Sequence, residues 1–149
     1  MLPLYAGFPA AIEYLRALSA GERPRTIARG RASNPGGVRT IRARGERLCV
    51  RVYGPEYRRL RSFMRALSPE LDAWMIEEGY GRTLSRPGLS VVERELVTVA
   101  ALAALGWERQ LDAHRRGAER VGARPAEVRA AERAGRASGR RSSARGGGR

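Results

Sequence analysis

Helix start and stop signals divide the second half of this chain into short segments, and their spacing limits what it can fold into. Ser90, followed three residues later by Glu93, has the pattern of a capping box, and Gly106 and Gly122 are typical helix ends. The predicted helices are 91–105, 107–121 and one that begins at Pro125 and fades near Gly135. Because such short turns join neighbouring helices in bundles, the sequence predicts an all-α fold.

The first half of the chain has weaker signals. The predicted segments are a helix over 9–19, an extended lead-in over 48–53 and helices over 55–67 and 69–78. A brief strand over 48–53 is the alternative there. The predicted organisation is an N-terminal helix within 1–19, an Arg/Gly/Pro-rich linker over 20–47, a helical domain over 48–135 and a disordered basic tail over 136–149.

The predicted helix 69–78 carries large apolar residues at helical spacing. We expect it to bury Leu71, Trp74 and Met75, and to end at Gly79 and Gly81.

The net charge of +14 is concentrated outside the predicted helical body. Residues 23–47 hold eight Arg and one Glu, and residues 133–149 hold six Arg and no acidic residue. All 29 basic residues are Arg, which favours codon bias and solvated segments as the explanation. Nucleic-acid binding is the weaker interpretation, because no aromatic residue lies among these arginines to stack on bases.

Length and cysteine content narrow the class of protein further. A chain of 149 residues can form one domain with a hydrophobic core. It has no apolar run long enough for a membrane span, and its first residues lack the basic region of a signal peptide. The single cysteine, Cys49, excludes an internal disulfide and favours a reducing, cytoplasmic location.

Glu95 and His114, the only histidine, fall on the apolar faces of consecutive predicted helices. Since a short turn joins these helices, they should pack antiparallel, and the two side chains could meet. A desolvated carboxylate beside an imidazole can transfer protons, and Gln110 lies one turn before His114. A structural hydrogen bond is the alternative, while a metal site would need more ligands than one histidine.

The residues around this pair resemble a known family. The stretch 80–106, the sequence Gln-Leu-Asp-Ala-His-Arg-Arg-Gly-Ala at 110–118 and Pro-Ala-Glu-Val at 125–128 are similar to the carboxymuconolactone decarboxylase family, which shares its fold with the alkylhydroperoxidase D-like proteins. The resemblance implies an alkylhydroperoxidase D-like helical bundle that forms a homo-oligomer, a trimer or a hexamer.

The redox branch of that family has a Glu before a CxxCxxxH motif. The two cysteine positions are Trp107 and Gln110 here, and Cys49 is far upstream, so a dithiol peroxidase is excluded. The resemblance implies the thiol-free branch, a cofactor-free lyase acting on a lactone or related small carboxylic acid. The catalytic candidates are Glu95 and His114, and the substrate-binding candidates are Gln110, Trp107 and Arg86, with Arg94 as an alternative to Arg86.

Residues 2–11 resemble the closing helix of the family, which normally follows the Pro-x-Glu-Val turn. Three explanations are open: a two-repeat protein cut short, a misplaced start codon, or an N-terminal helix that fills the empty position within the chain or between subunits. The alternative function is therefore a non-catalytic oligomerisation module of the same fold.

Overall fold

The computed structural model describes Gly7 and residues 36–146, with side chains as far as Gly139. Every regular element in residues 36–146 is a helix, which confirms the all-α prediction. None of these helices has the length and apolar character needed to cross a membrane. The predicted N-terminal helix over 9–19 and the predicted linker as far as residue 35 lie outside the described residues.

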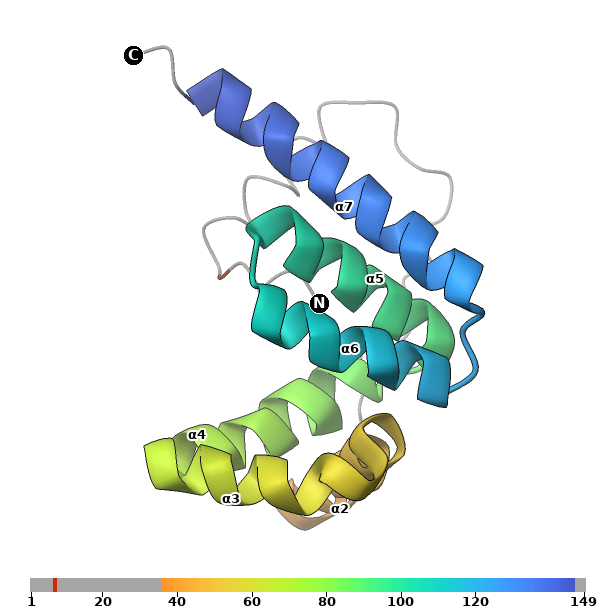
Figure 1. Cartoon of the computed structure of the whole chain (residues 1–149). Coiled ribbons are helices and arrows are strands. Elements are labelled where there is room, and N and C mark those ends of the chain that lie inside the picture. Colours follow the sequence, from red (N-terminus) through yellow and green to blue (C-terminus); the bar gives the residue numbers. More distant parts are fainter. Residues whose placement is uncertain (1–6, 8–35, 147–149) are drawn as a thin grey trace.

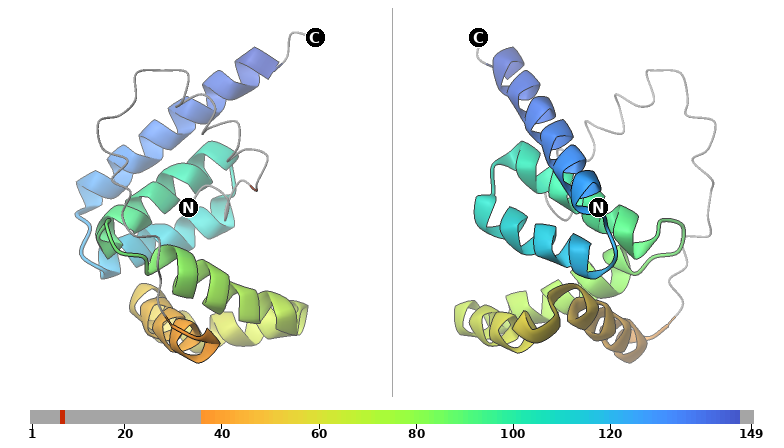
Figure 2. Two further views of the ribbon diagram at one scale, coloured as in Figure 1. Left: turned by 180° about the vertical axis from the view of Figure 1, so that it is seen from behind. Right: turned by 45° about the vertical axis from the view of Figure 1, so that its right-hand side comes forward.

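The helices form two layers, which Figures 1 and 2 show from three sides. The first layer consists of α2 (Val38–Tyr53), the 3-10 turn η1 (Gly54–Glu56), α3 (Tyr57–Leu67), α4 (Pro69–Trp74) and the π-helix η2 (Met75–Leu84). The second layer consists of α5 (Val91–Leu105), α6 (Glu108–Arg120) and α7 (Pro125–Gly146). The layers meet where α6 lies against α2.

Helix α2 corrects two predictions, because residues 38–47 are not a linker and residues 48–53 are not extended. One face of α2 is buried, and its members recur at helical spacing: Ile41, Leu48, Cys49 and Val52. The arginines of the segment stand largely on the other faces, where Arg39, Arg42 and Arg47 are exposed. Arginine favours helices, so an Arg-rich composition is compatible with an amphipathic helix.

Helix α2 crosses η2 at two glycines. A Cβ atom on Gly45 would lie 2.1 Å from the carbonyl oxygen of Ile76, and one on Gly81 would lie 2.6 Å from that of Ile41. Both Arg44 and Ser85 donate hydrogen bonds to the carbonyl of Gly81. These contacts keep the chain helical to Leu84, so the predicted end of this helix at Gly79 and Gly81 is wrong.

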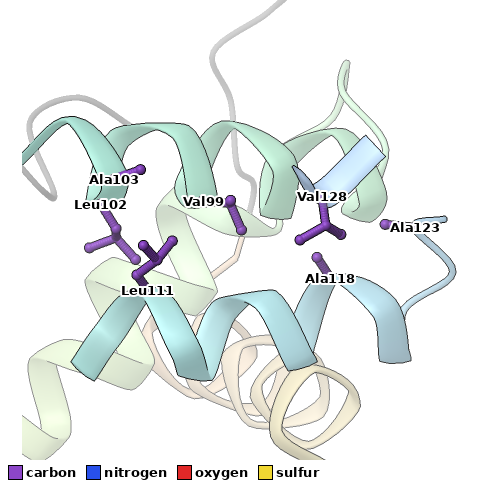
Figure 3. Close-up of a cluster of buried hydrophobic side chains, with 7 residues drawn as sticks. All are labelled: Val99, Leu102, Ala103, Leu111, Ala118, Ala123 and Val128. Carbon is purple, nitrogen blue, oxygen red and sulfur yellow. The ribbon is translucent and has the colours of Figure 1, made fainter. Parts of the chain in front are cut away.

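Helices α5, α6 and α7 enclose the second core (Figure 3). The cluster consists of Val99, Leu102, Ala103, Leu111, Ala118, Ala123 and Val128. The capping box is present, since Glu93 N donates to Ser90 Oγ at 3.2 Å and Ser90 N donates to Glu93 Oε2 at 2.7 Å. Gly106 ends α5 with a φ of 71°. The predicted helix 91–105 is confirmed.

Helix α7 extends to Gly146, whereas the sequence predicts that it fades near Gly135 and that a tail follows. It packs closely along α5, and Figure 1 shows the two side by side. A Cβ atom on Gly135 would lie 2.1 Å from the carbonyl oxygen of Ala100, and one on Gly139 would lie 2.4 Å from that of Ala104. The small residues that suggested a helix end therefore permit close packing.

Candidate functional site

Glu95 and His114 form a buried pair between the layers. Glu95 comes from the middle of α5, His114 from the middle of α6, and His114 Nδ1 lies 2.8 Å from Glu95 Oε2. Glu95 is 1 % exposed and His114 is 6 % exposed. The sequence predicts that these two side chains meet between consecutive helices, and the structure has this contact.

Helix α2 closes over the pair from the first layer. Gly117, one turn after His114, lies against Val52 of α2, where an added Cβ atom would come within 2.7 Å of Val52 Cγ1 and 3.3 Å of Glu95 Oε2. Arg120 donates a hydrogen bond to the carbonyl of Val52 at 2.5 Å. The carboxylate of Glu95 is therefore packed on the side of α6 that faces α2.

A pocket of about 560 Å³ opens beside His114, between α6 and the first layer. Its volume is in the range of small-molecule sites. Fifteen residues line it: Tyr53, Leu60, Phe63, Met64, Leu71, Trp74, Met75, Glu78, Gly79, Tyr80, Leu84, Arg109, Gln110, Ala113 and His114. Glu95 is not among them, so within the pair only the imidazole reaches the pocket.

Two tyrosines form the inner wall of the pocket. The ring of Tyr53 lies edge-on to His114, with centroids 6.1 Å apart, and edge-on to Tyr80 at 6.3 Å. Burial raises the pKa of Tyr53 to about 12. Its phenol therefore stays protonated at neutral pH and is a hydrogen-bond donor beside the imidazole.

The single cysteine lies in the apolar core of the first layer, with Leu48, Val52 and Ile76, and is not a reactive thiol. Cys49 is 0 % exposed, and burial raises the pKa of its thiol to about 12. At neutral pH almost none of it is thiolate, the form that attacks peroxides or disulfides.

The pocket includes one of the three predicted substrate-binding residues. Gln110 lines it, one turn before His114. Trp107 precedes α6 and Arg86 lies exposed in the turn before α5, and the structure brings neither to the pocket. Arg94 is buried and donates to the carbonyls of Leu89, Arg86 and Pro87, so it holds that turn.

The sequence analysis missed Arg109, Tyr53 and Tyr80, which also line the pocket. Helical spacing links Gln110 to His114, four residues later, but it did not indicate Arg109, which lies about 140° around the helix from His114. The tyrosines had no local signal either, since they enter the site through the crossing of α2 with η2.

Among the described residues, no three His, Cys, Asp or Glu side chains are placed to hold a metal ion together. His114 and Glu95 would supply two ligands at most, and they bond to each other.

Residues 69–142 match the model of the carboxymuconolactone decarboxylase family. This segment belongs to that family. It runs from the start of α4 into the last turns of α7 and contains both Glu95 and His114. The all-α fold of the carboxymuconolactone decarboxylase domain is alkylhydroperoxidase D-like. No curated protein and no solved structure matches the chain.

Proposed function

We propose that this chain carries out non-redox acid/base chemistry on a lactone or a related small carboxylic acid, with His114 as the proton-transferring group. The buried 2.8 Å contact between His114 and Glu95, at the wall of a pocket of ligand size, carries the proposal. The buried, protonated thiol of Cys49 favours chemistry without a thiol step.

The two members of the pair have different parts in this proposal. When Glu95 is ionised, its Oε2 accepts the proton on Nδ1 of His114, which fixes the ring tautomer. Proton exchange with a pocket ligand then goes through Nε2. Because Glu95 does not line the pocket, it is a positioning residue, and His114 is the catalytic residue.

The proposed reaction needs an electron sink and a proton. In a decarboxylation the bond to the carboxylate breaks, CO₂ leaves, and the bonding electrons move to a neighbouring carbonyl oxygen of the substrate. His114, protonated on both ring nitrogens, then delivers its Nε2 proton to the carbon that lost CO₂, and solvent returns a proton to Nε2. Tyr53, which remains protonated, is placed to donate a hydrogen bond to negative charge that develops in the pocket.

The test is turnover of 4-carboxymuconolactone and related lactone acids by the wild-type protein and by His114→Gln and Glu95→Gln. We expect His114→Gln to lower kcat by about 10²–10⁴-fold, the usual contribution of a general acid or base. Glu95→Gln should lower kcat, shift the pH profile and leave KM nearly unchanged. Asp112→Asn, an exposed change on the same helix, is the matched control. Turnover that neither pocket variant alters would disprove the proposal.

A non-catalytic oligomerisation module is the second candidate function, and the exposed apolar surface of α3 and α4 favours it. Leu67 is 61 % exposed and does not line the pocket. If this surface joins subunits into the expected trimer or hexamer, Leu67→Glu should lower the mass measured by light scattering to that of a monomer. Absence of turnover on any lactone acid, together with that change in mass, would favour this function.

A further inference from the structure

The two walls of the pocket differ in chemistry. The wall from α3, α4 and η2 is largely apolar, and its exposed apolar members include Phe63 at 52 % and Trp74 at 63 %. The facing wall from α6 is polar and contributes Arg109, Gln110 and His114. A ligand that fits both walls has an apolar body and one polar end.

The charges at the pocket fit a single anionic group. Glu78 is paired with Arg82 at 2.8 Å, so its charge is compensated. Within the described part of the chain, Arg109 makes no hydrogen bond or ion pair, and it is the one arginine there that lines the pocket. Arg94 is held by backbone carbonyls, and Arg86 lies outside the pocket. Among the described residues that line the pocket, a second or third carboxylate would find no further arginine.

The order of the polar groups along α6 sets the direction in which such a ligand would lie. Arg109 and Gln110 stand in the first turn of α6, and His114 is four residues after Gln110, on the same side of the helix. Since all three side chains line the pocket, a carboxylate held by Arg109 and Gln110 lies about one helical turn from the imidazole. The rest of the molecule then extends along the apolar wall.

We propose that the substrate class of this site is a carboxylic acid with one carboxylate and an extended apolar body, bound with the carboxylate at Arg109 and the body against α3, α4 and η2. This inference rests on the proposed function, since it names the ligand of the same pocket. The proposed ligand differs from compact acids with several carboxylates. The described pocket offers such acids one unpaired cation, Arg109, for all of their carboxylates.

Binding of hexanoate and octanoate, their neutral amides and 4-carboxymuconolactone to the full-length protein, measured by calorimetry, tests the inference. We expect octanoate to bind more tightly than hexanoate by about fourfold for each added CH₂ group, the value for full burial of a methylene. Octanoate should bind about fivefold more tightly than octanamide, a modest preference because Arg109 is exposed. The compact lactone acid should bind more weakly than octanoate.

Arg109→Gln should remove the preference for octanoate over octanamide and keep the dependence on chain length. Arg116→Gln is the matched control, because Arg116 stands on the same helix, outside the pocket. His114→Gln should still bind octanoate, so binding that survives in a variant without turnover separates this inference from the proposed function. Three results would each overturn the inference. The lactone acid could bind more tightly than octanoate, or Arg109→Gln could leave binding unchanged. Octanoate binding could also weaken as protein concentration rises, because a second copy covers the pocket.

Discussion

The two layers of this protein differ in how much of their apolar surface stays exposed. The second layer, α5 to α7, surrounds aliphatic side chains such as Leu111, which is 0 % exposed. The first layer has a buried apolar cluster of its own, but it leaves Phe63 52 % exposed and Trp74 63 % exposed. In the second layer the aliphatic side chains form a closed core, whereas part of the apolar surface of the first layer forms a wall of the pocket. The site lies where the two meet: the second layer supplies the Glu95–His114 pair, and the first layer supplies most of the pocket wall.

The buried ion pair of the first layer should give the largest effect on stability. Arg61 donates to both carboxylate oxygens of Asp72, at 2.5 and 2.9 Å, and links α3 to α4. Asp72→Asn leaves the guanidinium buried without its counter-charge, so we expect the free energy of unfolding to fall by about 3–5 kcal/mol. Urea denaturation measures this loss.

Arg65→Gln is the control for that experiment. Arg65 also bonds to Asp72, but its side chain is 58 % exposed. We expect a loss of about 0–1 kcal/mol. Equal losses for the two variants would show that burial does not set the strength of this cluster.

Truncation of one apolar residue in each layer compares the two surfaces directly. Leu111→Ala should lower the free energy of unfolding by about 2–5 kcal/mol, because it leaves a cavity in the second core. Phe63→Ala should cost less than about 1 kcal/mol, because Phe63 is 52 % exposed and little cavity forms. A large loss for Phe63→Ala, measured by thermal unfolding at several protein concentrations, would mean that a second copy covers the surface.

Alkaline pH should weaken the first layer, which holds every cysteine and tyrosine of residues 36–146. Burial raises the pKa of Cys49 from 9.0 to about 12. Between these values the unfolded chain releases the thiol proton while the folded chain keeps it. The free energy of unfolding therefore falls as pH rises, by up to about 1.4 kcal/mol per pH unit.

Cys49→Ala removes this contribution. We expect its free energy of unfolding to fall less between pH 8 and pH 11 than that of the wild type, while the contribution of Tyr53 remains. Chemical denaturation at several pH values measures the two slopes. If the free energy of unfolding fell equally with pH in both proteins, Cys49 would not contribute to the loss of stability at alkaline pH.

Helix caps should give the smallest difference between the layers. Ser90 forms a reciprocal capping box with Glu93 at the start of the 15-residue helix α5. Ser68 accepts one hydrogen bond, from Leu71 N, at the start of the six-residue helix α4. We expect Ser90→Ala to cost about 1 kcal/mol and Ser68→Ala about 0.5 kcal/mol in thermal unfolding. A larger loss for Ser68→Ala than for Ser90→Ala would contradict this ranking of the two caps.

Local signals predicted α5 and α6 well, and α2, η2 and the end of α7 poorly. Ser90, Glu93 and Gly106 set the bounds of α5 through contacts within a few residues. In α2 and η2 the deciding contacts join residues about 35 positions apart, such as Gly45 and Gly81, and no local pattern encodes them. The prediction that Leu71 and Trp74 are buried was wrong for the same reason, because helical spacing shows that a face is apolar but not what covers it.

The sequence by itself determined helices α5 and α6, the positions of Glu95 and His114 on their apolar faces, and the lack of a cysteine pair. These features depend on residue type and on spacing along one or two helices. Tertiary structure alone decided that Arg109 rather than Arg86 reaches the pocket, and that Tyr53 and Tyr80 form its inner wall. The physical reason is that this pocket exists only once α2 packs against η2 and α6, which brings together segments that are distant in the chain.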